Sequence, residues 1–405
     1  MLDVKSIRKD FPLLQNRNVI YLDNAATTLK PQSVIDAVTY YYTNLGANSH
    51  RGDYDLSHDV DVAYEDARAK VAKFINSEVN EVVFTSGASA SLNNAIYGVT
   101  QTFLHEGDEV LITTAEHASN VLPWFKMQQT NGIKIGYIPL DDEGRLTASN
   151  VKKSITKNTK VISIAHVTNV LGYIADVKEI CKVAHEHNIL VIVDGAQSVP
   201  HIPVDVKDLD CDFLCFSGHK MCGPTGIGVM FGKYELLDKI QPLMMGGGMN
   251  ARFDTCGDYS LVKPPHKFEA GTPHIEGAIG LGAACDYLMN IGMNNIQKYE
   301  KELHDYAIKR MKEVDGVKIY NERGDTGVIA FNYKDVFAQD ISSHLNKYNI
   351  CVRAGNHCAK ILMHFLKTTA TVRMSTYFYN TKDEVDAFVE ALKKGDDFLD
   401  AFFGW

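Results

Sequence analysis

The chain lacks the features that mark several classes of protein. It has no run of lysine or arginine, and 50 acidic residues outnumber 41 basic ones, for a net charge of -9. Because nucleic-acid binding relies on clustered positive charge, we expect no nucleic-acid partner. No apolar stretch reaches the length of a membrane span, and charges are scattered through the first ten residues, where a signal peptide would be apolar. We therefore expect a cytoplasmic protein without membrane association.

The chain also lacks any Cys-x-x-Cys pair, although it contains 8 cysteines. Wide spacing of this kind indicates neither a disulfide framework nor a zinc site, and we expect no metal. Most of the cysteines are predicted to be small buried apolar residues. A reactive cysteine therefore has to be identified from its surroundings.

What is present is an average composition for a folded chain, with 45% hydrophobic and 22% charged residues. We predict a large α/β domain over residues 19–290, where short β-branched runs alternate with amphipathic helical stretches as in a mostly parallel sheet. A smaller α+β domain is predicted over 291–405, together with 1–18. The predicted strands of the large domain are 19–22, 81–85, 109–113, 134–139, 160–166, 189–193, 213–217 and 226–231. The predicted helices include 60–74, 177–184, 275–289, 296–314, 339–347 and 382–399.

Two residues that follow predicted strands point to a particular chemistry. Asp194 ends the apolar run ILVIVD, at the sheet edge where ligands bind in open α/β folds. Lys220 follows the strand at 213–217. Taken alone, Asp194 is explained equally well as a helix cap, and Lys220 as a solvated side chain. Together they supply what pyridoxal phosphate needs, an amine that bonds to the cofactor and a carboxylate that keeps its pyridine nitrogen protonated.

A phosphate-binding turn is predicted over residues 85–91. Its small residues lead from a strand into a helix, where free N–H groups and the helix dipole favour an anion. We expect Ala88 and Ser89 to bind the phosphate of the cofactor. Ser217 and His219, which lie just before Lys220, are expected to reach the same phosphate.

Seven motifs, spread over nearly the whole chain, resemble those of the class V aminotransferase group, and within it those of the SufS-type (group II) cysteine desulfurases and selenocysteine lyases. They are YLDNAATT (21–28), EHA (116–118), NVLG (169–172), DGAQ (194–197), SGHK (217–220), FEAGTP (268–273) and RAGNHC (353–358).

The resemblance implies a pyridoxal-phosphate-dependent transferase of fold type I that acts as a homodimer. It assigns Lys220 to the covalent bond with the cofactor, Asp194 to the pyridine nitrogen and Gln197 to the ring hydroxyl. His117 would stack on the ring and take part in catalysis. Without the family pattern, His117 would be read as a hydrogen-bonded structural histidine.

The resemblance also implies how substrate and partner subunit would be contacted. Asn169 would contact both cofactor and substrate, while Arg373 and His50 would hold the substrate. An arginine suits a carboxylate because its planar fork makes two parallel hydrogen bonds; the alternative for Arg373 is a surface ion pair. Three residues would reach the phosphate bound by the partner subunit: Gly271, Thr272 and Arg51.

Cys358 is the predicted nucleophile, the residue that separates a desulfurase from its aminotransferase relatives. It follows a predicted strand and precedes a helical pattern over 359–366, so we expect it near a helix N-terminus, which stabilises a thiolate. The alternative is a buried inert thiol, which we retain for the other cysteines.

The resemblance therefore implies conversion of L-cysteine to L-alanine, with a persulfide formed on Cys358. A sulfur-acceptor protein of the SufE or SufU type would unload the persulfide for iron–sulfur cluster assembly. L-selenocysteine is an alternative substrate, as in a selenocysteine lyase, and a class V aminotransferase or epimerase is a more distant alternative. A non-enzymatic sulfur scaffold would need neither Lys220 nor Asp194.

The chain departs from the family pattern at two places. Ala88 and Ser89 stand where two threonines are common, so one hydroxyl is lost while the backbone donors remain. Asn356 stands where a histidine usually precedes His357, which removes a titratable group from the loop of the nucleophile.

Overall fold

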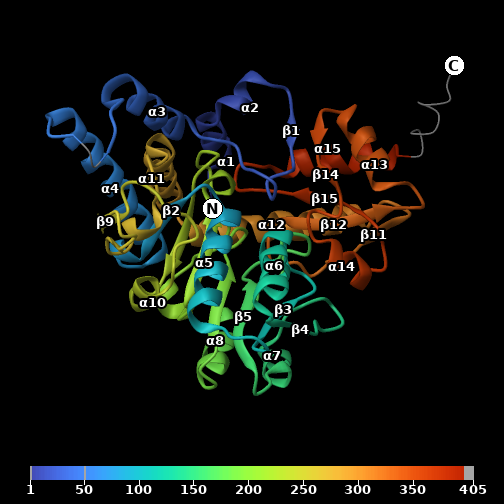
Figure 1. Ribbon diagram of the computed structural model, residues 1–405. Helices are drawn as coiled ribbons and strands as arrows, with labels where there is room; N and C mark the ends of the chain where they lie inside the picture. The colour runs from blue at the N-terminus through green and yellow to red at the C-terminus, as the bar shows by residue number, and fades with distance from the viewer. Residues whose placement is uncertain (1, 50–51, 396–405) are drawn as a thin grey trace.

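The computed structural model describes residues 2–49 and 52–395, and its centre is a sheet of seven strands (Figure 1). The strands are β2 (Val82–Thr85), β3 (Glu109–Thr113), β4 (Lys134–Ile138), β5 (Thr159–Ala165), β6 (Leu190–Asp194), β7 (Phe213–Ser217) and β8 (Gly228–Gly232). Their order across the sheet is β2-β8-β7-β6-β5-β3-β4. β3 to β7 run parallel, and β8 is antiparallel to both of its neighbours. The predicted mixed, mostly parallel sheet is thus confirmed.

Helices cover both faces of this sheet because its strands are apolar on both sides. Along β6, Val191 and Val193 pack into one core, whereas Ile192 packs into the core on the opposite face. Such continuous apolar runs are typical of parallel strands buried on both faces. The first core contains residues of α4 (Asp55–Ile75), α8 (Val177–His185) and α11 (Ile275–Ile291). The second contains residues of α5 (Ala88–Phe103) and α6 (Leu122–Asn131).

A second, antiparallel sheet lies in the C-terminal part of the chain. Its strands are β11 (Val317–Ile319), β12 (Val328–Tyr333), β14 (Arg353–Gly355) and β15 (Thr371–Ser375), in the order β11-β12-β15-β14. Three helices accompany it: α12 (Met293–Met311), α13 (Ala338–Asn346) and α15 (Lys382–Lys393). The predicted helix over 382–399 is too long, since the chain leaves the helix after Lys393 and turns at Gly395, a residue type common at helix C-termini. Its predicted end at 396–399 lies outside the described residues.

The two sheets are joined through the N-terminal segment. The run at 19–22, predicted as a strand of the large domain, forms β1 (Ile20–Tyr21), which pairs in parallel with β13 (Ile350–Cys351) and not with the seven-stranded sheet. A strand's partner depends on tertiary packing, which the local sequence does not encode. Asp23 forms a bridge with Ser375 at the end of β15. The Asn24 side chain donates to the Ser375 carbonyl at 2.8 Å. On the other side, the Thr28 N–H donates to the carbonyl of His219, just after β7, so the segment after β1 lies beside strand ends of both sheets. The predicted boundary between the large and the small domain, at residues 290 and 291, stays a prediction. Tyr377, from the C-terminal part of the chain, packs into the same core as α11.

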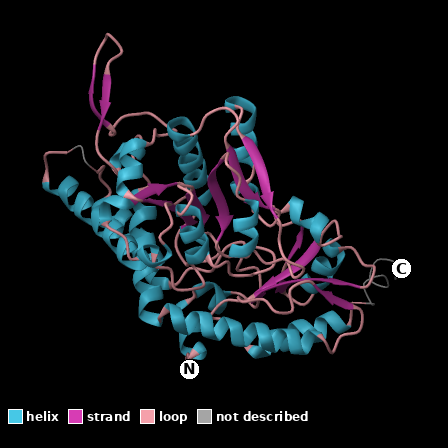
Figure 2. Ribbon diagram, turned by 90° about the horizontal axis from the view of Figure 1, so that it is seen from below, coloured by secondary structure: helices cyan, strands magenta, loops and turns pink. Residues whose placement is uncertain are grey.

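The remaining elements surround these layers. A hairpin of β9 (Asn250–Phe253) and β10 (Tyr259–Leu261) projects away from the body of the molecule (Figure 2). The other helices are α1 (Val4–Ile7), α2 (Pro12–Asn16), α3 (Gln32–Tyr40), α7 (Ala148–Ser154), α9 (Val206–Leu209), α10 (Tyr234–Lys239) and α14 (Lys360–Phe365). Among the helices described, none combines the length and apolar character needed to cross a membrane.

Candidate active site

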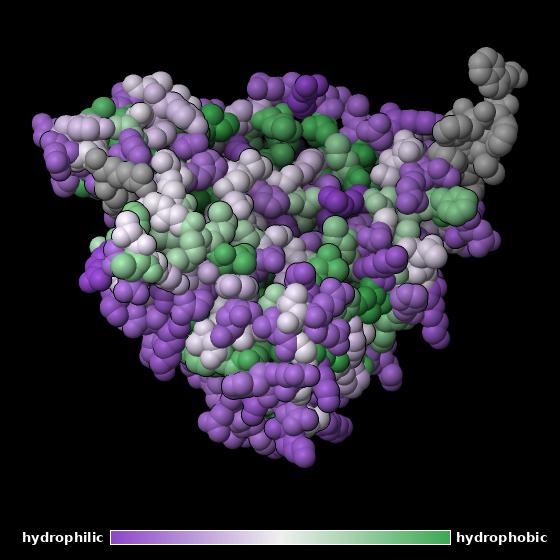
Figure 3. All heavy atoms as spheres, in the orientation of Figure 1, coloured by the Kyte–Doolittle hydropathy of each residue, from purple (hydrophilic) through white to green (hydrophobic). Residues whose placement is uncertain are grey.

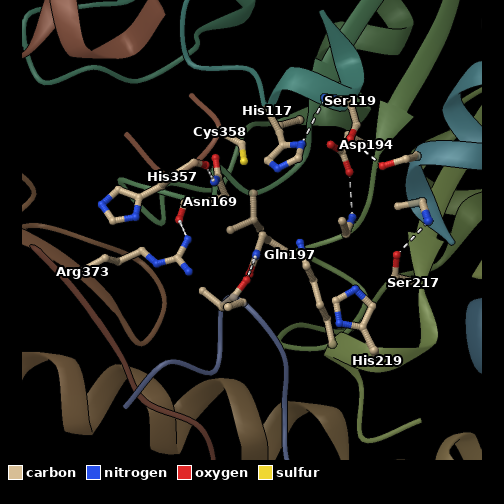
Figure 4. Close-up of a pocket in the computed structure, with 18 of the residues that line it drawn as sticks. His117, Ser119, Asn169, Asp194, Gln197, Ser217, His219, His357, Cys358 and Arg373 are labelled. Atoms are coloured by element: carbon tan, nitrogen blue, oxygen red, sulfur yellow. Dashed lines mark hydrogen bonds between the residues drawn. The ribbon is translucent and has the colours of Figure 1, made fainter. Parts of the chain in front are cut away.

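The carboxyl ends of β5, β6 and β7 open on a cavity of ≈ 210 Å³. Strand β15 and the loop of Cys358 close its other side (Figure 4). Most of the residues predicted from the sequence line this one cavity. They are Ala88, Ser89, His117, Asn169, Asp194, Gln197, Ser217, His219, Lys220, Cys358 and Arg373.

Asp194 and Gln197 lie on the floor of the cavity, and both are buried. Asp194 is the last residue of β6, and its Oδ1 accepts the Ala196 N–H at 2.9 Å, which fixes the carboxylate at the strand end. Gln197 donates from Nε2 to the Ala25 carbonyl at 2.7 Å. Within the described chain its Oε1 is buried without a hydrogen-bond partner. A buried amide oxygen of this kind can accept a hydroxyl group of a bound molecule.

Lys220 lies in the short turn after β7 and points into the cavity. The pKa of its amine is lowered to about 8, mainly by burial; Asp194 opposes the change, and the charge of Arg373 adds to it. An ordinary lysine is almost entirely protonated at neutral pH, whereas a pKa near 8 leaves a substantial fraction of free amine. The site thus offers a nucleophilic amine, the group that forms a bond with an aldehyde cofactor.

The predicted phosphate turn forms the start of α5. Gly87 caps the helix with φ +148°, and the Ala88 N–H donates to the Ser217 hydroxyl at 2.7 Å. The hydroxyls of Ser89 and Ser119 lie 2.6 Å apart. The first-turn amides of a helix have no partner within the helix, so this end can bind a phosphate although Ala88 has no hydroxyl.

His117 is held in one orientation at the cavity wall. Its Nδ1 accepts the Ser119 N–H at 3.1 Å, so in the neutral ring the proton is on Nε2. Burial lowers the pKa of His117, and the charge of Lys220 lowers it further. Asp194 opposes this change, and the net effect favours the neutral form of the ring. The Ala118 N–H donates to the Cys358 carbonyl at 2.7 Å, which ties the loop of His117 to that of the cysteine.

Arg373 and Asn169 form the side of the cavity opposite the phosphate turn. Arg373 is 2% exposed, so the alternative of a surface ion pair is wrong. Its Nη1 donates to the Asn169 carbonyl at 2.9 Å, and its Nη2 lies 3.3 Å from the Asp23 carboxylate. Within the described chain, Arg373 Nε and Asn169 Oδ1 are buried without partners. A donor and an acceptor are thus available to a small polar molecule.

Cys358 is exposed and lies two residues before α14. His357 and Cys358 both have positive φ, +52° and +57°, a conformation that costs energy for residues with a side chain. Asn169 Nδ2 donates to the His357 carbonyl at 2.8 Å, and the Asn356 side-chain oxygen accepts the Cys358 N–H at 3.1 Å. Asn356, which stands where the family pattern usually has a histidine, therefore supplies a hydrogen bond that supports the loop of Cys358.

The other cysteines and His357 have surroundings of a different kind. His357 turns away from Cys358 and bonds through Nε2 to the Thr371 carbonyl at 3.0 Å, and burial lowers its pKa to about 3. Of the remaining cysteines, Cys256 is exposed in the turn between β9 and β10 and Cys351 is half-buried, so the prediction of a buried thiol is wrong for these two. The others are buried, as predicted: Cys181, Cys211, Cys215, Cys222 and Cys285.

Some of the predicted site residues do not line this cavity, and some residues that do line it were not predicted. Gly271 and Thr272 do not line this cavity; Thr272 lines a separate one. The predicted His50 and Arg51 lie outside the described residues. Arg353 lines the cavity and was missed, although it stands five residues before Cys358 in the same motif. Ser119 was missed as well, because its contact with the His117 ring depends on local backbone geometry.

The donor set fits pyridoxal phosphate. Lys220 supplies an amine with a lowered pKa, Asp194 a carboxylate at a strand end, and the start of α5 supplies an anion site. The buried Oε1 of Gln197, which has no partner in the described chain, matches a ring hydroxyl. These are the groups that tune and hold this cofactor in general.

Comparison with known proteins agrees with this geometry. The model of the aminotransferase class-V family matches residues 20–388, so the chain belongs to this family. A probable cysteine desulfurase of Halalkalibacterium halodurans is 43% identical over 99% of this chain and 100% of its own length. A cysteine desulfurase of Haloferax volcanii is 43% identical over 96% of each chain.

Solved structures show the same fold. The apo cysteine desulfurase from Thermococcus onnurineus NA1 has a TM-score of 0.93 and 39% identity over 97% of this chain and 98% of its own. The cysteine desulfurase CsdA from Escherichia coli, in an S-sulfonic acid form, has a TM-score of 0.92 and 35% identity over 98% of this chain and 99% of its own. The family and the donor set agree on pyridoxal phosphate as the cofactor.

Proposed function

We propose that the protein is a cysteine desulfurase that releases L-alanine from L-cysteine and takes up the sulfur as a persulfide on Cys358. The observation that carries the proposal is the position of Cys358, an exposed thiol on the same cavity as Lys220 and Arg373. The Cys358 carbonyl accepts the Ala118 N–H, so the loop of the cysteine is held against the loop of His117.

Binding of cysteine begins with its carboxylate, for which Arg373 is the receptor. The guanidinium is buried, keeps an N–H without a partner in the described chain, and is oriented by Asn169 and Asp23. A charge-assisted bond in such a dry site is stronger than one in water. Asn169 Oδ1 can accept an N–H or O–H from cofactor or substrate. His50, the third predicted substrate residue, lies outside the described residues.

Proton transfer then falls to Lys220. Bound pyridoxal phosphate supplies an electron sink that lowers the barrier to loss of the Cα proton. Asp194 would keep a proton at the ring nitrogen, Gln197 would contact the ring hydroxyl, and the Lys220 amine would move the proton at Cα. The lowered pKa of Lys220 suits an amine that must both take up and give back a proton near neutral pH.

Sulfur transfer requires a nucleophile and a proton donor. The Cys358 thiolate attacks the substrate sulfur and forms a sulfur–sulfur bond. The bond between the substrate sulfur and Cβ breaks, and the electron pair of that bond goes to the carbon skeleton. After protonation, the carbon skeleton leaves as alanine. The two sulfurs are oxidised while the carbon is reduced. His117 is neutral and carries its proton on Nε2, so it can exchange a proton with the reacting groups.

Two partners belong to this proposal. An exposed thiol can be reached by a second protein, which supports transfer of the persulfide sulfur to an acceptor of the SufE or SufU type for iron–sulfur cluster assembly. A homodimer is supported by exposed apolar side chains in and beside the projecting hairpin. They include Leu243, Met244, Met245, Phe253 and Tyr259. Pale green surface lies on this side of the molecule, at the left of Figure 3. In such a dimer Gly271, Thr272 and Arg51 would complete the phosphate site of the neighbour.

The experiment supplies L-cysteine, L-selenocysteine and a 2-oxo acid with an amino donor separately to the purified holoenzyme. We expect alanine and a protein persulfide from cysteine, and no transamination product. Mass spectrometry after one turnover should place the added sulfur on the peptide that contains Cys358. Alanine from selenocysteine alone would instead indicate a selenocysteine lyase, and a transamination product would indicate an aminotransferase.

A further inference from the structure

The backbone around Lys220 is held by a segment almost two hundred residues earlier in the chain. The carbonyl of His219 belongs to the planar peptide that carries the Lys220 nitrogen, so its orientation sets the direction in which Lys220 leaves the backbone. Four donors converge on this one oxygen. They are Thr28 N at 3.0 Å, Thr27 Oγ1 at 2.9 Å, Thr28 Oγ1 at 3.2 Å and Lys30 Nζ at 3.0 Å.

The same segment also holds the backbone on the other side of Lys220. The Thr28 hydroxyl accepts the Cys222 N–H at 2.8 Å, and Cys222 itself has a positive φ of +63°. A carbonyl oxygen has only two lone pairs, so four donors exceed what its hydrogen bonding requires. The contacts of residues 27–30 therefore restrain the turn that carries Lys220 at both ends.

Lys30 is the unusual member of this set. In the described chain the bonds of its ammonium go to the carbonyl oxygens of Thr28 and His219, and no carboxylate is among them. Burial lowers the pKa of Lys30 to about 8. Removing a cation from water without an opposing charge is costly, and neutral donors already reach the His219 oxygen. What the ammonium adds is a charge-assisted bond, roughly twice as strong as a neutral one.

We propose that Lys30 is a positioning residue for Lys220. Its ammonium holds the His219 carbonyl, and this contact keeps the amine of Lys220 directed into the cavity toward the cofactor site. The inference rests on the proposed role of Lys220. The competing explanation is that Lys30 only fastens residues 27–30 to the body of the protein, with no effect on the reacting amine.

The test uses the variant Lys30→Met, which keeps most of the apolar stem and removes the ammonium. We expect kcat of the holoenzyme for alanine formation to fall about tenfold, less than the roughly hundredfold loss that a 1 Å misplacement of a reacting group can cause, because neutral donors still hold the His219 carbonyl. KM for cysteine should change less than about twofold, since Lys30 does not line the cavity that holds Arg373. The visible circular dichroism per bound cofactor should change, and Lys30→Arg should restore most of both signals.

Lys267 offers a matched control. Its ammonium, like that of the half-buried Lys30, bonds to two carbonyls, Leu237 O at 3.2 Å and Asp238 O at 2.8 Å; Lys267 is buried and does not line the cavity. Lys267→Met should lower the melting temperature while kcat and the dichroism per bound cofactor stay at wild-type values. A milder variant, Thr27→Val, removes one neutral donor from the His219 carbonyl and should shift both signals in the same direction as Lys30→Met, by less.

Three results would overturn the inference. One is a Lys30→Met enzyme with a lowered melting temperature but wild-type kcat and dichroism, and another is an equal loss of kcat in Lys267→Met. If Lys30→Met does not fold, Thr27→Val decides, and wild-type values in that variant count against the role. A failure of the proposed function itself would be seen in the wild-type protein, which would then form no alanine from cysteine.

Discussion

Arg373→Lys tests how the substrate carboxylate is bound. The arginine is 2% exposed and makes two bonds in the plane of its guanidinium, to the Asn169 carbonyl at 2.9 Å and to Asp23 at 3.3 Å. A lysine keeps the charge but presents it as a point, so it cannot hold both partners and a carboxylate with the same geometry. The variant therefore loses at least one charge-assisted hydrogen bond to the substrate.

The size of the effect follows from the energy of that bond. A hydrogen bond to a charged group contributes about 1.5–3 kcal/mol, which corresponds to a loss in kcat/KM for cysteine of about 10- to 150-fold. Because the carboxylate takes no part in bond breaking, most of the loss should appear in KM. The assay measures alanine against cysteine concentration, with bound cofactor determined by its visible absorbance.

Arg145→Lys is the control for this experiment. Arg145 also makes a two-point contact with a carboxylate, Asp325 at 2.7 and 3.3 Å, but it does not line the cavity. We expect its KM to equal that of the wild type. An unchanged KM in Arg373→Lys, or an equal change in Arg145→Lys, would refute the assignment of Arg373 to the carboxylate.

Three further predictions concern the cofactor, the nucleophile and the dimer. Lys220→Ala should abolish the visible absorbance of the bound cofactor, and borohydride should attach the cofactor to Lys220 in the wild type. Because the pKa of Lys220 is lowered to about 8, its amine is free above this pH and protonated below it, so the rate of cofactor capture should fall as the pH is lowered from 8. Labelling of another lysine would contradict this assignment. Cys358→Ala should keep the cofactor spectrum and bind cysteine but form no persulfide, and it should lose more activity on cysteine than on selenocysteine, since selenium is the better leaving group. Added sulfur on Cys351 would refute that role. Mixing Arg51→Ala chains with Lys220→Ala chains should restore activity if Arg51 acts across a dimer interface, and no gain on mixing would show that it does not.

Local sequence accounts for the strands and for the residues at their ends. The runs that form β3 and β7 were predicted with their observed bounds, and the run before Asp194 was predicted within one residue. Short apolar β-branched runs favour buried strands wherever they pack, so the sheet follows from neighbours in the chain. Since parallel strands end at a common edge, Asp194 and Lys220 could be placed at one site from the sequence alone.

Contacts between segments distant in the chain were decided only by the packing of the two sheets. Arg373 meets Asp23 across 350 residues, Asn169 holds the His357 carbonyl across 188, and Lys30 reaches His219 across 189. No periodicity in a single chain encodes such pairs, because each partner is a polar residue whose position relative to the other depends on how the sheets and loops pack. The sequence alone therefore determined which groups are available at the strand ends. The tertiary structure decided which of them are buried, which keep an unpaired donor or acceptor, and how the amine of Lys220 is held, because desolvation and hydrogen-bond direction arise only once the layers are packed.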